Sequence, residues 1–315
     1  MRRFTSVQQI PADFGETTVA IGNFDGVHRG HQAMLATVVS HARQSGRRAV
    51  AVTFWPHPLH VHVPDGSPQL ITGLSQRLEL LESMGVDATL VIDYTLEFAQ
   101  QSPDEFVERY FVDALQAKEV VVGPDVRFGW QNVGDVTTMI QLGEKYDFSV
   151  TVQAMVSEDG GRRCSSSWAR DLLTRGDVTD VAEVLGRSHT VRGVVVHGFK
   201  RGRELGFPTA NLGDDMSGMI PGDGVYSGWL VRADGQRLPA AISVGTNPTF
   251  ANKNRSVEAH VLDRDDLDLY DENVTFEFVK RLRANVKFDG LEELIDQMHR
   301  DVDHARAQLG LSRQD

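Results

Sequence analysis

The chain has very little cysteine, no long apolar run and no excess of basic residues, and each absence narrows what it can be. Of its 315 residues only one, Cys164, is a cysteine, so no disulfide can form within the chain, as is usual in a reducing cytoplasm. No apolar run approaches the length of a membrane span, and residues 1–5 lack the apolar stretch of a signal peptide. We therefore expect a cytoplasmic protein with no membrane partner.

The net charge of −12 is the next constraint. An acidic surface repels the phosphate backbone, so we expect no nucleic-acid partner, although a local basic pocket for a nucleotide remains compatible with this total. The composition, with 41% hydrophobic and 24% charged residues, is that of an ordinary globular protein, and 315 residues suffice for two domains with separate cores. The sequence allows a weak or transient homo-oligomer.

The two halves of the chain differ in their hydrophobic pattern. The first half predicts strands at residues 18–21, 48–54, 88–92, 119–122 and 148–155, which alternate with helices at 74–84, 103–115 and 136–145. Such alternation predicts a parallel α/β sheet covered on both faces. After Gly186, strands are predicted at residues 190–197, 224–232, 238–244, 256–263 and 274–282, before a helix at 291–309. Strands without intervening helices favour an antiparallel barrel or sandwich, and we predict domains 1–184 and 185–315.

The run from Gly22 to His31 (GNFDGVHRGH) joins the first predicted strand to a predicted helix. A glycine-rich turn at this point lets backbone N–H groups and the positive helix end approach a phosphate. His28 and His31 fall on one side of the first helical turn, and Gly30 leaves room for a nucleotide against the backbone. In this context the motif favours phosphate chemistry over a structural turn.

Two further segments of the first half carry polar groups, and each segment allows two interpretations. Asp125 and Arg127 follow a predicted strand, where they could meet a nucleotide or form a surface ion pair in a turn. The serines of residues 165–167 open a helix, either as caps for its first N–H groups or as the lining of an anion site. Arg170, one turn further on, would then clamp a phosphate.

In the second half, residues 198–206 form a glycine-rich loop with three basic side chains, suited to cover a polyphosphate. Thr209 and Asn211 point to the same face of an extended segment and offer neutral oxygens suited to Mg²⁺; the alternative is a simple turn. Glu258 lies on the polar face of a predicted strand. Periodicity alone leaves open whether it is a solvated residue or a base in a site.

Together these motifs resemble one family, the bifunctional riboflavin kinase/FMN adenylyltransferases, in the family's own order and over nearly the whole chain. The resemblance implies an α/β Rossmann-like nucleotidyltransferase domain, followed by a six-stranded β-barrel of the riboflavin kinase type with a C-terminal helix. It implies ATP-dependent phosphorylation of riboflavin to FMN and adenylylation of FMN to FAD. The matching stretches are residues 22–31, 53–58, 123–129, 165–170, 198–211, 224–226, 245–250, 258–262 and 282–288.

The resemblance also assigns roles to individual residues. The implied catalytic residues are Glu258, as the base of the kinase reaction, and His28, His31 and Arg170, at the phosphates of ATP. Mg²⁺, bound with ATP, would be held by Thr209 and Asn211. The implied nucleotide contacts are Gly22, Phe24, Gly30, Ser166, Gly198, Lys200, Gly202, Arg203 and Gly206. The implied flavin contacts are Asn23, Asp125, Arg127, Phe128 and Arg283.

The sequence departs from the family's usual pattern at Ser167 and Ala169, where a threonine and a branched apolar residue are usual, and at Val126, where phenylalanine is usual. These departures motivate a second hypothesis, a flavin-binding regulator or storage protein with one or both activities decayed. A third is adenylyl or cytidylyl transfer to another phosphate acceptor, because the His-x-Gly-His motif serves several such reactions.

Overall fold

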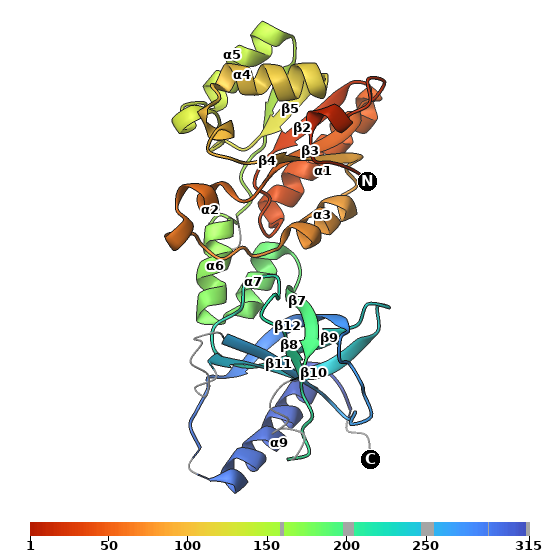
Figure 1. The fold of residues 1–315 in the computed structure, drawn as a ribbon, viewed down its shortest axis with the longest axis vertical. Coiled ribbons are helices and arrows are strands. Elements are labelled where there is room, and N and C mark those ends of the chain that lie inside the picture. Colours follow the sequence, from red (N-terminus) through yellow and green to blue (C-terminus); the bar gives the residue numbers. More distant parts are fainter. Residues whose placement is uncertain (158–160, 198–204, 247–254, 289, 313–315) are drawn as a thin grey trace. The chain divides into compact units, whose positions relative to one another are not determined.

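The computed structural model describes residues 1–157, 161–197, 205–246, 255–288 and 290–312 (Figure 1). The internal contacts of the chain divide it into two compact units, Met1–Ser165 and Ser166–Asp315. Each unit has a fold of its own, as the change of hydrophobic pattern predicted.

The first unit contains a parallel sheet with the strand order β1-β4-β3-β2-β5-β6, in which every neighbouring pair is parallel. The strands are β1 (Arg2–Phe4), β2 (Thr17–Ile21), β3 (Arg48–Trp55), β4 (Ala88–Asp93), β5 (Ala117–Val122) and β6 (Ser149–Val152). Its main helices are α1 (Arg29–Ser45), α3 (Leu74–Ser83), α4 (Pro103–Phe106), which continues as a π-helical segment (Val107–Ala114), and α5 (Val136–Tyr146).

Both faces of this sheet are buried, because alternate residues of each central strand serve different cores. Val19 and Ile21 of β2 pack in a core with α5 and the π-helical segment. Ala20, between them, belongs to a second core with α1 and α3 on the other face (Figure 1). This second core has small residues on its strands, such as Ala49 and Ala51 of β3, which leave room for α1.

The strand order places a topological switch point between β2 and β5. From β2 the chain proceeds to β3 on one side of the sheet, whereas β5 pairs with β2 on the other side. In open parallel sheets, ligands bind outside the carboxyl ends of the strands at such a point. The residues that follow β2 and β5 are therefore the first place to look for a site.

The second unit is a closed antiparallel barrel with the strand order β10-β11-β8-β7-β12-β9. Its interior is filled by buried side chains at alternate positions of the strands, such as Val257 and Ala259. This alternation is the pattern from which the sequence predicted short strands. The strands are β7 (His189–Val196), β8 (Ala210–Leu212), β9 (Gly224–Val231), β10 (Arg237–Thr246), β11 (Arg255–Val261) and β12 (Asn273–Arg283).

Three helices accompany the barrel. The helices α6 (Ser166–Arg175) and α7 (Val178–Leu185) pack on each other, and α7 packs against β7 and β12. The helix α9 (Leu291–Gln308) contacts β9, β10 and β12 (Figure 1). By contacts, α6 and α7 thus belong to the barrel unit; the predicted domain boundary between residues 184 and 185, at the end of α7, stays a prediction.

The predicted fold class is confirmed, with local differences. The sequence pattern did not predict β1 and β8, because three-residue strands show too little alternation. The last strand of the sheet is shorter than predicted and covers only Ser149–Val152. Within the described residues, no helix combines the length and apolar character needed to cross a bilayer.

Candidate functional site

The loop between β2 and α1 lies at the switch point and has an unusual backbone. Phe24, Gly26 and Val27 have positive φ angles of 49°, 78° and 39°. For Phe24 and Val27 this costs about 1–3 kcal/mol each, and such strain persists only where surrounding contacts enforce it. Gly26 needs to be glycine, because a Cβ there would also lie 3.0 Å from the Ile71 side chain.

His28 and His31 are brought together at the start of α1, as predicted. His28 is the N-cap residue, and its Nδ1 accepts a hydrogen bond of 3.4 Å from the His31 backbone N–H. The two rings are stacked with centroids 3.7 Å apart. A Cβ on Gly30 would lie 3.1 Å from the His28 ring, so a larger residue would require the ring to shift by a few tenths of an ångström. His28, with Nδ1 as acceptor, can donate from Nε2 toward a ligand.

The charge of His31 is controlled by its surroundings. Burial lowers the pKa of His31 well below its usual value, and His28, Arg77 and Arg163 lower it further through their charges. The buried Nδ1 of His31 has no hydrogen-bond partner among the described residues. These surroundings favour the uncharged form of His31, and its unpaired Nδ1 is buried next to the cavity that its residue lines.

A cavity of about 260 Å³ opens beside the two histidines. It is lined by residues that follow β2, β5 and β6, so the segments after these strands meet at the carboxyl edge of the sheet. The predicted site residues that line it are Gly22, Asn23, His28, Gly30, His31, Asp125 and Arg127. Phe24 is fully buried beneath the loop, and its ring packs under Gly22.

Sequence reasoning missed Arg163, which lines this cavity. Its Nη2 lies 2.6 Å from Oδ2 of Asp125, so the aspartate predicted as a flavin contact is engaged in an ion pair within the cavity wall. Arg127 lies 3.7 Å from Asp135 in a second, similarly exposed pair. The basic dipeptide Arg162–Arg163, just before the serine run, was the signal that could have revealed the residue.

A second cavity, of about 400 Å³, shares Asn23, Phe54, Asp125 and Arg127 with the first. Its wall is aromatic: it includes Phe54, Tyr94, Phe98, Phe106 and the predicted Phe128. Tyr94 and Phe98 follow the end of β4, a segment to which the sequence analysis gave no role. Flat aromatic walls next to a phosphate cavity suit a planar ring attached to a phosphate.

Ser166 and Arg170 lie on α6, and by its contacts this helix belongs to the second unit. Ser166 follows two residues after Cys164, which lines the first cavity. Ala169 is fully buried, and nothing in the structure explains why it is smaller than the branched apolar residue of the resemblance. The part of Ser166 and Arg170 in a phosphate site stays a prediction.

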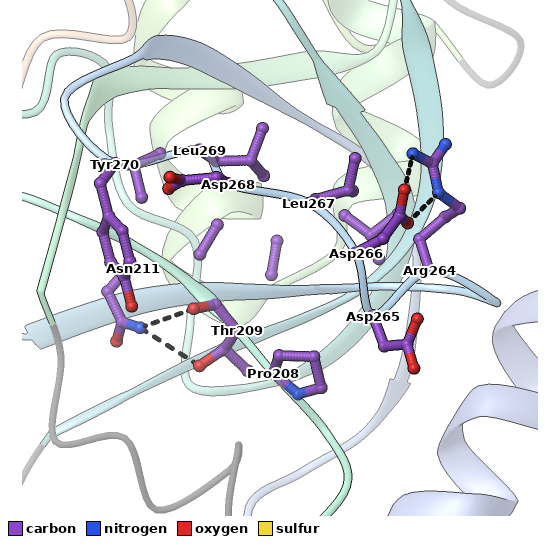
Figure 2. Close-up of a pocket in the computed structure, with 14 residues that line it drawn as sticks. Pro208, Thr209, Asn211, Arg264, Asp265, Asp266, Leu267, Asp268, Leu269 and Tyr270 are labelled. Atoms are coloured by element: carbon purple, nitrogen blue, oxygen red, sulfur yellow. Dashed lines mark hydrogen bonds and ion pairs between the residues drawn. The ribbon is translucent and has the colours of Figure 1, made fainter.

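In the barrel, the register of β8 and β11 pairs Asn211 directly with Glu258. Thr209 Oγ1 donates to Glu258 Oε2 at 3.3 Å. Asn211 Nδ2 donates to both the carbonyl and the hydroxyl oxygen of Thr209 at 3.2 Å (Figure 2). Burial raises the pKa of Glu258, and hydrogen bonds from Thr209 and Ser256 partly offset this. The three predicted residues thus form one cluster, and Glu258 is a partly buried carboxylate rather than a solvated one.

A cavity of about 320 Å³ adjoins this cluster (Figure 2). One wall is the segment from Pro208 to Asn211, and the other is the loop of residues 264–270, which the sequence analysis gave no role. Arg264 in this loop pairs with Asp266 at 2.5 Å, and Tyr270 lines the same cavity as Asn211. The Asp-rich run before Tyr270 was the available signal.

Other predicted contacts of the barrel stand apart from this cluster or outside the description. Gly198, Lys200, Gly202 and Arg203 lie outside the described residues, whereas Gly206 is described, with a φ of 85°. Arg283 donates from Nε and Nη2 to the carboxylate of Asp301 on α9, at 2.8 and 2.7 Å. Its predicted flavin contact is not tested by this arrangement.

Comparisons with known proteins agree with both units. Residues 10–167 match the family model for FAD synthetase and residues 185–309 the model for riboflavin kinase. Relatives named bifunctional riboflavin kinase/FMN adenylyltransferase include those of Bacillus subtilis and Escherichia coli. The first is 33% identical over 302 residues and the second 34% over 295, each over 94% of this chain and 93% of the relative. A solved structure from Streptococcus pneumoniae, titled a macrolide-efflux protein, superposes with a TM-score of 0.87 at 30% identity, covering 96% of this chain and 98% of that one.

A parallel α/β unit with a phosphate loop, followed by a closed barrel with a buried carboxylate, defines a two-module transferase that uses nucleotides. The chain belongs to the bifunctional riboflavin kinase/FMN adenylyltransferase family.

Proposed function

We propose that the chain carries out two consecutive reactions, the ATP-dependent phosphorylation of riboflavin to FMN and the adenylylation of FMN to FAD. The observation that carries the proposal is that each unit has its own cavity and that their titratable groups differ. Histidines and an arginine line the 260 Å³ cavity of the first unit, and a partly buried carboxylate adjoins the 320 Å³ cavity of the barrel.

In the kinase reaction a ribityl hydroxyl of riboflavin attacks the γ-phosphate of ATP, and ADP leaves. The hydroxyl holds its proton at neutral pH, so a base that accepts it as the new O–P bond forms accelerates the reaction. Glu258 is the carboxylate in position for this role. Its raised pKa makes it a better proton acceptor than a solvated carboxylate.

The donor set beside Glu258 fits Mg²⁺. Thr209 and Asn211 present a hydroxyl and an amide, whose oxygens are hard neutral ligands, and such ligands suit a Mg²⁺ ion that also holds phosphate oxygens and water. When bound, the ion supplies positive charge for the transferred phosphate. The adjoining cavity of 320 Å³ provides space for the nucleotide of ATP.

In the adenylyl reaction an oxygen of the FMN phosphate attacks the α-phosphorus of ATP, and the bond to the leaving pyrophosphate breaks. This nucleophile is already ionised at neutral pH, because the second pKa of a phosphate monoester is about 6. The site needs positioning and hydrogen-bond donors more than a base. His28, His31 and Arg163 supply donors, and the aromatic cavity next to them would hold the flavin ring.

We also propose a cytoplasmic location, substrates limited to small molecules and a weak or transient homo-oligomer. The location is supported by the single, buried cysteine, and the absence of nucleic-acid and membrane partners by the net charge of −12 and by the lack of a membrane-spanning helix among the described residues.

The direct test is incubation of the purified chain with ATP, Mg²⁺ and riboflavin, followed by chromatographic separation of the flavins. FMN and then FAD should accumulate. A chain that binds flavin without turnover would support the regulator or storage hypothesis instead. Replacement of FMN by other phosphate acceptors, and of ATP by CTP, tests the third hypothesis in the same assay.

A further inference from the structure

A buried ion pair lies beneath the loop between β2 and α1, and neither of the two proposed reactions uses it. Asp25 in the loop and Arg77 on α3 have side chains that are 1% and 0% exposed, with Oδ1 and Nη2 4.0 Å apart. Among the described residues, Arg77 has the largest side chain that is fully buried. Burial of two charges lowers the stability of a fold unless each charge has well-placed partners. The partners of Asp25 and Arg77 therefore indicate what the pair does.

Asp25 ties the loop to the segment that leads into α3. Its Oδ2 accepts from the backbone N–H of Ile71 at 3.1 Å, and its Oδ1 accepts from that of Thr72 at 3.0 Å. Thr72 completes the tie, because its Oγ1 accepts from the backbone N–H of Gly26 at 3.1 Å. The residues with positive φ, Phe24, Gly26 and Val27, thus lie in a loop that is tied to the segment before α3.

Arg77 connects the same segment to the neighbouring strand. Its Nη1 donates to the carbonyl of Phe54 near the end of β3 at 3.4 Å, and its guanidinium lies 5.7 Å from the centre of the Trp55 ring. The positive charge of Arg77 is also among the causes that lower the pKa of His31. The charge therefore acts on the cavity although the side chain does not line it.

We propose that Asp25 and Arg77 are positioning residues of the adenylyl-transfer site. They hold the Phe24–Val27 loop in the left-handed geometry that sets the start of α1 and its two histidines, and Arg77 places a fixed positive charge behind His31. The proposal rests on the proposed adenylyl transfer, and the barrel reaction serves as an independent reference in the same molecule.

Four charged or titratable groups bear on His31. His28 stacks on it, Arg77 acts from α3, and Arg163 acts from the segment after β6. Asp125, after β5, is paired with Arg163. Removal of Arg77 makes protonation of His31 easier, so its titration should move to higher pH, whereas a lysine at position 77 should preserve most of the effect.

The experiment uses the full chain with Arg77→Met, Arg77→Lys and the charge-neutral pair Asp25→Asn/Arg77→Met. For Arg77→Met we expect kcat for FAD formation from FMN to fall by about tenfold or more, because small displacements of a catalytic group have effects of this size. Formation of FMN by the same sample should remain within roughly twofold, since that site lies in the other unit. NMR titration of the His31 ring, assigned with His31→Gln, should show the shift to higher pH.

Leu81→Ala is the matched control, because Leu81 is a fully buried residue of the same helix and core and carries no charge. It should lower the stability of the first unit without moving the His31 titration or kcat. The double variant covers the case in which an unpaired Asp25 damages the fold.

The proposal is wrong if the double variant keeps kcat within roughly threefold of the wild type and His31 titrates unchanged. Absence of FAD formation by the wild type would instead refute the proposed function. The NMR titration would still decide whether Arg77 acts on His31.

Discussion

Both candidate sites of this chain are proposed to transfer a phosphorus-containing group from ATP, but one is lined by basic side chains and the other is centred on a carboxylate. The site at the edge of the parallel sheet gathers His28, His31 and Arg163, and the aspartate within it, Asp125, is paired with Arg163. The barrel site is centred on Glu258, a carboxylate whose pKa is raised by burial. The difference follows from the nucleophile, because an alcohol must lose a proton during attack and a phosphate does not.

A change at Glu258 should separate the two activities by the largest factor. Glu258→Gln should reduce FMN formation by about 100-fold or more, because it removes the base and keeps the shape. Formation of FAD from supplied FMN should be unchanged in the same sample. Asn211→Ala should behave alike through loss of a metal ligand. Equal loss of both activities would contradict separate sites.

The reciprocal change is His31→Ala. It should reduce FAD formation from FMN by about 100-fold, the typical effect of removing one donor to a transition state, and leave the kinase reaction intact. Flavin chromatography after incubation with riboflavin and ATP should show that FMN accumulates without FAD. Accumulation of FAD at the wild-type rate would remove His31 from the mechanism.

The aromatic cavity allows a further test of the adenylyl reaction, because we propose that its wall contacts the flavin ring of FMN. Tyr94→Leu should raise KM for FMN several-fold to about tenfold, because stacking on an aromatic ring contributes about 0.5–1.5 kcal/mol. Tyr94→Phe is the control, since both variants lose the hydrogen bond between the Tyr94 hydroxyl and His62 at 2.9 Å. If both variants behave alike, the ring does not contact the flavin.

The pH dependence of FMN formation should follow Glu258. The rate falls as pH decreases through the pKa of this base, and the raised pKa places the fall at higher pH than for a solvated glutamate. The hydrogen bond from Ser256 lowers this pKa, so Ser256→Ala should move the fall to still higher pH. FAD formation from FMN, measured in parallel, should keep its profile. A shift in the opposite direction would refute the assignment of the base.

The smallest expected effect concerns stability. Because the folded state raises the pKa of Glu258, folding favours its protonated form, and this contribution is lost as pH rises through that pKa. Glu258→Gln should therefore stabilise the barrel by about 1 kcal/mol in mildly alkaline buffer and by much less in acid. Thermal unfolding at both pH values measures this. A gain that is equal at both would indicate a cause other than ionisation.

Much of the fold could be predicted because its elements are long and periodic. The alternation of strands and helices indicated the parallel sheet, and the short strands after Gly186 indicated an antiparallel unit. The three-residue strand β8 was not recognised as a strand, although it closes the barrel between β7 and β11. Pairing partners of so short a segment are decided by distant strands and leave little trace in its own sequence.

Within the sites, the sequence revealed groups that are close along the chain. His28 and His31 lie within one helical turn, and Thr209 and Asn211 are two residues apart. It did not reveal Arg163 opposite Asp125, the charge of Arg77 under the loop, or the wall formed by Tyr94 and Phe98. These contacts join segments that are separated along the chain; Asp125 and Arg163, for example, are 38 residues apart.

The sequence by itself determined which kinds of element form, in what order, and which chemical groups each loop carries, since these depend on local periodicity and residue type. Only the tertiary structure decided which of these groups share a cavity and with what charge. Burial and neighbouring charges set the pKa of His31 and of Glu258, and both depend on segments far away along the chain.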